Sequence, residues 1–150
     1  MKSGTVVGLA VAAATLIGGA AVYYLQAFEY YERRDGLESV VIGGEAFAVQ
    51  GYRGLDHDAL PLRLRGCFRV SDPEAALAAG PAARRPEPFG APSWFECWNA
   101  EALDEDLKAG RARAVSAEIS GSGDFATERV VAIYPDGRAF QWRRLMKDVR

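Results

Sequence analysis

An uncharged run near the N-terminus constrains this sequence more than any other feature. From Thr5 to Leu25 no residue carries a charge, and the side-chain polar atoms in the run are threonine and tyrosine hydroxyls. As a helix that rises about 1.5 Å per residue, the run is roughly 30 Å long, which matches the hydrocarbon core of a bilayer. We therefore expect residues 1–34 to form a transmembrane anchor with a juxtamembrane helix, and residues 35–150 to form a soluble domain.

A cleaved signal peptide is the alternative to a retained anchor. Signal peptides have an apolar core of roughly 7–15 residues and a cleavage site of small residues, which residues 18–21 (Gly-Gly-Ala-Ala) would supply. The run here is longer, and it leads into an aromatic cluster between Tyr23 and Tyr31. Aromatic rings prefer the headgroup level of a membrane, so the cluster favours a helix that is retained.

The charges that flank the run bear on orientation. Lys2 precedes it, whereas Arg33 and Arg34 follow it among several acidic residues, so the count of basic residues barely decides between the two directions. The short N-terminus and the mixed acidic flank favour a signal anchor whose C-terminal part is exported. The sequence thus predicts a single-pass protein of a bacterial inner membrane, with its domain in the periplasm.

Small residues recur at four-residue spacing in the run, which lets a second helix approach closely. The helix-packing candidates are Gly4, Gly8, Ala12, Ala14 and Gly18. The alternative is a span that is simply rich in alanine and glycine. The expected partners are the lipid bilayer and an integral membrane protein or complex that contacts this helix.

The rest of the chain predicts an α+β domain with a small, mainly antiparallel sheet and one or two short helices. Apolar alternation and turn residues mark the strands, and Asp72 and Asn99 are typical helix N-caps. We expect the anchor helix to continue to about Arg34 and the proline-rich stretch 80–93 to be a loop. The expected strands are residues 39–42, 45–52, 62–70, 112–119, 129–134 and 138–144.

The sequence contains two cysteines, Cys67 and Cys97. In an exported domain a structural disulfide would persist, and a closed loop of this length would add roughly 3.5 kcal/mol of stability. Two free structural thiols are a second possibility. A reactive thiol is a third, because arginines beside Cys67 would lower its pKa. Two cysteines and one distant histidine, His57, make a poor zinc site, so neither a metal nor a cofactor is expected.

Three arginines, Arg63, Arg65 and Arg69, recur along one predicted strand and form a candidate anion-binding patch. The alternative is a solvated sheet face whose arginines pair with acidic neighbours. The tryptophans Trp94, Trp98 and Trp142 would line a cleft or, alternatively, form the core. The formal net charge of −2 gives no reason to expect nucleic acid as a partner. No catalytic motif is recognisable in the sequence.

Four segments together resemble an uncharacterised family of short, N-terminally anchored alphaproteobacterial proteins of unknown function. They are residues 23–26 (YYLQ), 62–68 (LRLRGCF), 91–98 (APSWFECW) and 129–138 (RVVAIYPDGR). The resemblance implies an anchored α+β protein and supports treating Cys67 and Cys97 as a pair. It supplies no activity, and relatives are expected to carry a longer tail beyond the position of Arg150.

These features favour a membrane-anchored, non-enzymatic accessory or binding module that docks on a larger membrane or envelope assembly. Two alternatives stay open. One is a thiol-dependent redox or assembly factor that uses Cys67 and Cys97. The other is an exported binder of an envelope ligand. It would use the three arginines and the aromatic side chains of the domain, namely Trp94, Phe95, Trp98, Phe140 and Trp142.

Overall fold

A computed structural model describes residues 2–149, and it divides the chain into two compact units between Glu32 and Arg33. The first unit is the N-terminal helix. The second unit, which spans residues 33–150 by its bounds, is the folded domain.

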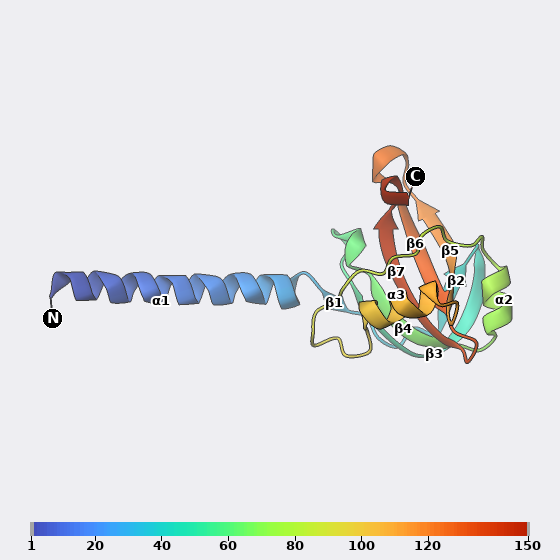
Figure 1. Ribbon diagram of the computed structural model, residues 1–150, viewed down its shortest axis with the longest axis horizontal. Coiled ribbons are helices and arrows are strands. Elements are labelled where there is room, and N and C mark those ends of the chain that lie inside the picture. Colours follow the sequence, from blue (N-terminus) through green and yellow to red (C-terminus); the bar gives the residue numbers. More distant parts are fainter. Residues whose placement is uncertain (1, 150) are drawn as a thin grey trace. The chain divides into compact units, whose positions relative to one another are not determined.

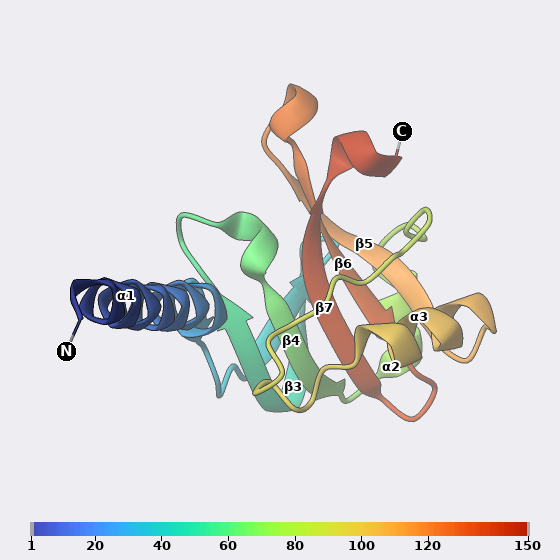
Figure 2. The ribbon, with the colours of Figure 1, turned by 60° about the vertical axis from the view of Figure 1, so that its left-hand side comes forward.

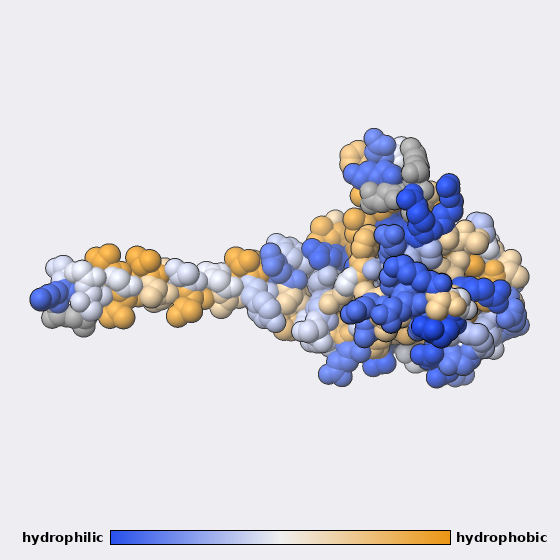
Figure 3. Space-filling model, viewed as in Figure 1, coloured by the Kyte–Doolittle hydropathy of each residue, from blue (hydrophilic) through white to orange (hydrophobic). Residues whose placement is uncertain are grey.

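The first unit is one continuous apolar helix. It comprises α1 (Ser3–Tyr24) and a π-helical turn, η1 (Leu25–Glu29), and none of its side chains is buried. Over Ser3–Glu29 its most apolar window has a mean hydropathy of 2.1, and Figure 3 shows apolar side chains along its surface. The helix was expected to reach about Arg34 but ends at Glu29. The backbone of residues 34–36 instead pairs with a strand of the domain, with Arg34 N–H donating to Gly54 O at 2.9 Å.

The second unit confirms the expected α+β class with a mainly antiparallel sheet (Figure 1). Strand β1 (Glu32–Arg33) spans the boundary between the units. The other strands of the second unit are β2 (Ser39–Ile42), β3 (Glu45–Asp56), β4 (Arg65–Val70), β5 (Arg113–Ser120), β6 (Thr127–Ile133) and β7 (Arg138–Leu145). Its helices are α2 (Pro73–Ala78) and α3 (Ala100–Lys108), and its short 3-10 helices are η2 (Pro61–Arg63), η3 (Gly123–Phe125) and η4 (Met146–Val149). As expected, the Asp72 and Asn99 side chains cap α2 and α3 by accepting backbone N–H bonds.

The sheet curves into a barrel that is closed at one end. Its strand order is β1-β3-β4-β7-β6-β5, and β2 also pairs with β3. The far edges meet where Gly43 N–H, in the β2–β3 turn, donates to Ala117 O of β5 at 2.9 Å. Beside this contact, a cavity lined by Val40 and Val41 of β2 and by Glu118 of β5 opens between these edges, and we call it the barrel mouth.

The inward sheet face forms the hydrophobic core. It holds Val49, Tyr52 and Phe68 from β3 and β4, and Val131 and Ile133 from β6, all less than 9% exposed. The rings of Tyr52 and Phe68 stack with their centroids 5.5 Å apart. Burial of these side chains contributes most of the stabilisation that a domain of this size has available.

The outward face of the sheet is also covered. The connection between α2 and α3, yellow-green in Figure 2, runs across β7 and β4, and α3 follows it on the same side. Residues 62–70 were expected to form a half-buried strand. The structure has a 3-10 turn at Pro61–Arg63, a strand from Arg65, and buried side chains on both faces, because this connection covers Arg65 and Cys67.

Candidate functional site

A cavity of about 480 Å³ opens at the barrel mouth. Apolar side chains form part of its wall, and polar side chains from β2, β3, β5, β6 and β7, together with Arg34, form the rest. Its lining comprises Arg34, Leu37, Ser39, Val40, Val41, Tyr52, Leu55, Asp56, Leu64, Glu118, Arg129, Gln141 and Arg143. Both its volume and its mixture of apolar walls and a few polar groups are typical of small-molecule sites.

A buried chain of hydrogen bonds crosses the interior side of this cavity. Arg129 Nη1 donates to Gln141 Oε1 at 3.0 Å, and Gln141 Nε2 donates to the Tyr52 hydroxyl at 2.7 Å. Arg129 Nη2 also donates to the carbonyl of Val41 on β2. The guanidinium therefore links β6 to β2 across the gap between the sheet edges. Its Nε lies 3.5 Å from the carboxylate of Glu118, which is 54% exposed at the rim.

Two glycines and a bulge place the Tyr52 ring. A Cβ on Gly66 would lie 2.8 Å from the Tyr52 hydroxyl, and a Cβ on Gly54 would lie 2.6 Å from its ring. The β3–β4 register shifts between Gln50 and Arg53, where Gly51 adopts a φ of +62°. This extra residue is a β-bulge, and it turns Tyr52 onto the same inward face as Val49.

Burial controls the ionisation of these groups. Desolvation raises the pKa of Tyr52, and this effect outweighs the hydrogen bond from Gln141. The phenol therefore keeps its proton at neutral pH. Desolvation lowers the pKa of Arg129, although Glu118 opposes the shift. An arginine pKa starts so high that the guanidinium stays charged.

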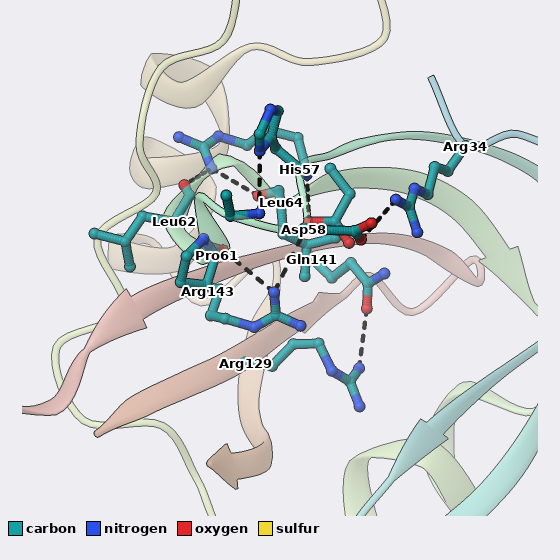
Figure 4. Close-up of polar contacts among 12 residues, drawn as sticks. Arg34, His57, Asp58, Pro61, Leu62, Leu64, Arg129, Gln141 and Arg143 are labelled. Carbon is teal, nitrogen blue, oxygen red and sulfur yellow. Dashed lines mark hydrogen bonds and ion pairs between the residues drawn. The ribbon is translucent and has the colours of Figure 1, made fainter. Parts of the chain in front are cut away.

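The rim of the cavity carries further charges, several of which Figure 4 draws. Arg143 Nη1 donates to Pro61 O at 3.2 Å and lies 3.9 Å from Asp56. Arg34 pairs with Asp58 at 2.8 Å. His57 Nδ1 accepts a bond from a backbone N–H two residues away, at 3.1 Å. His57 is thus engaged in the local turn that joins β3 to η2.

Cys67 and Cys97 form a disulfide, with Cα atoms 6.3 Å apart. Cys67 lies on the outward face of β4 and is 5% exposed, and Cys97 belongs to the connection that covers this face. The bridge ties that connection to the sheet. Of the three states considered for these cysteines, the structure has the structural disulfide.

The three arginines of the predicted anion patch do not lie together in one environment. Arg65 is 4% exposed, and its guanidinium donates to the carbonyls of Gly90, Leu62 and Leu64. Arg63 belongs to η2 rather than to the strand. Arg69 is exposed and lines a separate groove beside the disulfide, together with Arg53 and Arg138. Anion binding at the predicted patch stays a prediction.

The predicted aromatic candidates divide between core and surface. Trp98 and Trp142 are buried with centroids 6.0 Å apart, whereas Trp94 is half-buried. The helix-packing candidates lie on α1, where a Cβ added at Gly4, Gly8 or Gly18 would meet nothing within 4 Å. Within residues 2–149, no group of three or more histidine, cysteine or acidic side chains is placed to hold a metal ion.

The sequence patterns did not predict the side chains that build the mouth, namely Tyr52, Arg129, Gln141 and Arg143. Their positions along the predicted strands could have indicated them, because alternate residues of a strand share one face. In β7, Gln141 shares a face with Ala139, and in β6, Arg129 shares a face with Val131, so polar side chains interrupt an apolar face. Tyr52 gave no such signal, because only the bulge turns it inward.

Comparison with known proteins adds a family but no activity. No curated protein and no solved structure gives a significant match. A family of unknown function, DUF6446, matches residues 38–149, which include every strand of the domain except β1. The predicted alphaproteobacterial source is untested by this match. This chain belongs to the family of unknown function DUF6446.

Proposed function

We propose that this chain is a membrane-anchored, non-enzymatic accessory or binding module whose domain serves a larger membrane or envelope assembly. The observation that carries the proposal is the helix Ser3–Glu29, which is long and apolar enough to span a bilayer and buries none of its side chains. Apolar surface of this extent is unfavourable in water. A bilayer would surround this surface with lipid tails, and the helix satisfies its own backbone hydrogen bonds there.

The disulfide supports an exported domain. Disulfides persist in oxidising compartments and are rare in the cytosol, and Cys67–Cys97 joins two segments of the domain. We therefore assign the domain to the periplasmic side of a bacterial inner membrane. A retained signal anchor would give this orientation, whereas cleavage at residues 18–21 would release the domain.

A partner in the membrane is part of the proposal. Small residues on α1 leave open space that a second helix would fill, and Gly8 lies at the centre of one such ridge, between Gly4 and Ala12. The redox alternative gains no support from the structure, since Cys67 is buried and bonded. An envelope-ligand site built on Trp98 and Trp142 gains none either, because both rings are buried.

Labelling of thiols in intact membranes tests the anchoring and the topology. The full chain should remain in the membrane after alkaline extraction, and external protease should digest the domain in spheroplasts. A membrane-permeant maleimide should label Cys67 and Cys97 only after reduction. Recovery of a soluble, shortened chain would show cleavage, and labelling without reduction would contradict an oxidising compartment.

The helix partner requires a separate experiment with matched variants. In-membrane cross-linking at native expression should detect an adduct that Gly8→Leu weakens at least tenfold. Ala20→Leu is the control, because Ala20 is also exposed. At about 100° per residue it lies on a helix face between the ridge of Gly4, Gly8 and Ala12 and the ridge of Ala10, Ala14 and Gly18. If both variants leave the adduct unchanged, or if the chain is a monomer under these conditions, the proposed helix contact is wrong.

A further inference from the structure

The direction of each hydrogen bond at the barrel mouth follows from the chemistry of Arg129. A guanidinium has only donors, so the side-chain oxygen of Gln141 must face Arg129. The Gln141 amide nitrogen must then face Tyr52, which is the assignment that the contacts show. The Tyr52 oxygen therefore accepts, and its own proton must point elsewhere.

No acceptor for that proton exists among the described residues. Within residues 2–149, the only side-chain hydrogen bond of the Tyr52 hydroxyl is the one that it accepts from Gln141. Tyr52 is 4% exposed, and it lines the cavity. A buried hydroxyl with an unused proton is costly unless an acceptor enters the cavity.

Arg129 also has donors left over. Its contacts to Gln141, Val41 and Glu118 use three of the five N–H groups of a guanidinium. Among the residues that the structure describes, Glu118 is the one carboxylate paired with Arg129, and it lies at 3.5 Å on an exposed side chain that can swing away. Arg143 adds a second guanidinium to the same lining.

Five apolar side chains, Leu37, Val40, Val41, Leu55 and Leu64, form much of the remaining wall of the cavity, which Arg34, Ser39 and Asp56 complete. Leu55, Leu64 and Val40 are each no more than 5% exposed. A ligand that suits this cavity therefore needs an anionic acceptor for Arg129 and Tyr52, and an apolar body for the leucines. A planar carboxylate matches a guanidinium better than a single-atom anion does.

We propose that the barrel mouth binds a small organic monocarboxylate with an apolar body, whose carboxylate accepts hydrogen bonds from Arg129 and Tyr52 and displaces Glu118. This proposal goes beyond membrane anchoring and does not depend on it. A free acid and the terminal carboxylate of a short peptide share this chemistry.

Calorimetric titration of the full-length chain in nanodiscs tests the ligand class. Phenylacetate is the probe, and phenylacetamide, which has the same shape without the charge, is its control. Acetate tests the need for an apolar body, and N-acetylphenylalanine against N-acetylphenylalanine amide tests the peptide source. Phenylacetate should bind at least tenfold more tightly than phenylacetamide or acetate. Equal binding of acid and amide, or no binding at millimolar concentration, would overturn the proposal.

Three variants test the residues. Tyr52→Phe should weaken phenylacetate binding about tenfold, the loss expected for one hydrogen bond to a charged group. Glu118→Gln should tighten it several-fold, because this removes the competing carboxylate from an exposed position where folding is not at risk. Arg113→Gln removes an exposed arginine elsewhere on the domain and should change nothing. If Glu118→Gln leaves the affinity unchanged, the carboxylate does not bind at Arg129.

Discussion

At the scale of single residues, this domain is unusual for the charges that it buries. Glu128 and Arg144 form an ion pair at 2.7 Å with side chains 6% and 4% exposed. Arg144 also donates to the carbonyls of Arg84 and Arg85 in the connection that covers the outward face. The pair therefore fixes this connection to β6 and β7. A buried charge without its partner would strongly destabilise the fold.

Replacement of Glu128 by glutamine should destabilise the domain by about 3–5 kcal/mol, because it leaves Arg144 charged and buried without a counter-ion. Urea unfolding of the domain measures the loss. Asp104→Asn is the control, since its ion pair with Lys108 has a lysine that is 74% exposed and should contribute less than about 1 kcal/mol. Equal losses in the two variants would contradict a special role for the buried pair.

The hydrogen bond between Tyr134 and Asp106 should make the stability of the fold depend on pH in the alkaline range. Tyr134 donates to Asp106 at 2.5 Å, and burial together with this bond raises the pKa of Tyr134 to about 12 from its ordinary 10.0. The protonated phenol therefore stabilises the fold fully below pH 10, and this contribution is lost as the pH rises from 10 to about 12. We expect the stability gap between the wild type and Tyr134→Phe to narrow over this range in thermal unfolding.

Asp106 responds at the other end of the pH scale. Hydrogen bonds from Tyr134 and then Arg111 lower the pKa of Asp106. Its contribution is therefore present above the ordinary aspartate pKa and is lost as the pH falls through the lowered value. Asp106→Asn serves as the control at both ends of the pH scale. It should remove the loss of stability at acid pH and reduce the loss of stability at alkaline pH. An unchanged gap at every pH would rule out this pair as the cause.

At the scale of elements, local patterns predicted most of the fold and little of the candidate site. The hairpins of β2–β3 and β6–β7 follow from turn residues and alternation, and both helices begin at the expected caps. Strand β3 runs past its predicted end to Asp56, because pairing with β4 continues to Leu55. The barrel mouth escaped prediction for a related reason. The bulge at Gly51 turns Tyr52 to the inward face of the sheet. No local sequence pattern indicates which strands will surround this side chain.

The β2–β3 turn is where the barrel closes, and its two glycines are unequal. Both Gly43 and Gly44 have a positive φ, but a Cβ on Gly43 would lie 1.9 Å from Ala79 O, whereas a Cβ on Gly44 would meet nothing. Gly44→Ala should cost about 1 kcal/mol from backbone strain. Gly43→Ala should cost about 1–3 kcal/mol more, because the α2 end must move. Urea unfolding would measure the loss of stability in each variant. Equal losses would show that the end of α2 moves aside at no cost.

At the scale of the whole molecule, the chain combines two units whose surfaces differ in polarity. The helix presents apolar side chains throughout, and the domain presents charged ones over a core of its own. The domain has both faces of its sheet covered by its own residues. Its fold should therefore not depend on the helix.

Removal of residues 1–32 should leave a soluble domain with an unchanged fold. We expect its melting temperature to lie within a few degrees of that of the full chain in nanodiscs, because α1 buries none of its side chains. Circular dichroism and near-ultraviolet spectra compare the two forms. An aggregated or unfolded fragment would show that the helix contributes to the core.

The disulfide also affects how the protein matures. Six cysteines allow fifteen intramolecular pairings, but two allow only one, and the bridge joins the two cysteines of this sequence. Oxidation therefore cannot yield a scrambled monomer. Formation of the bridge requires an oxidant, whereas an isomerase would find no wrong intramolecular bond to correct.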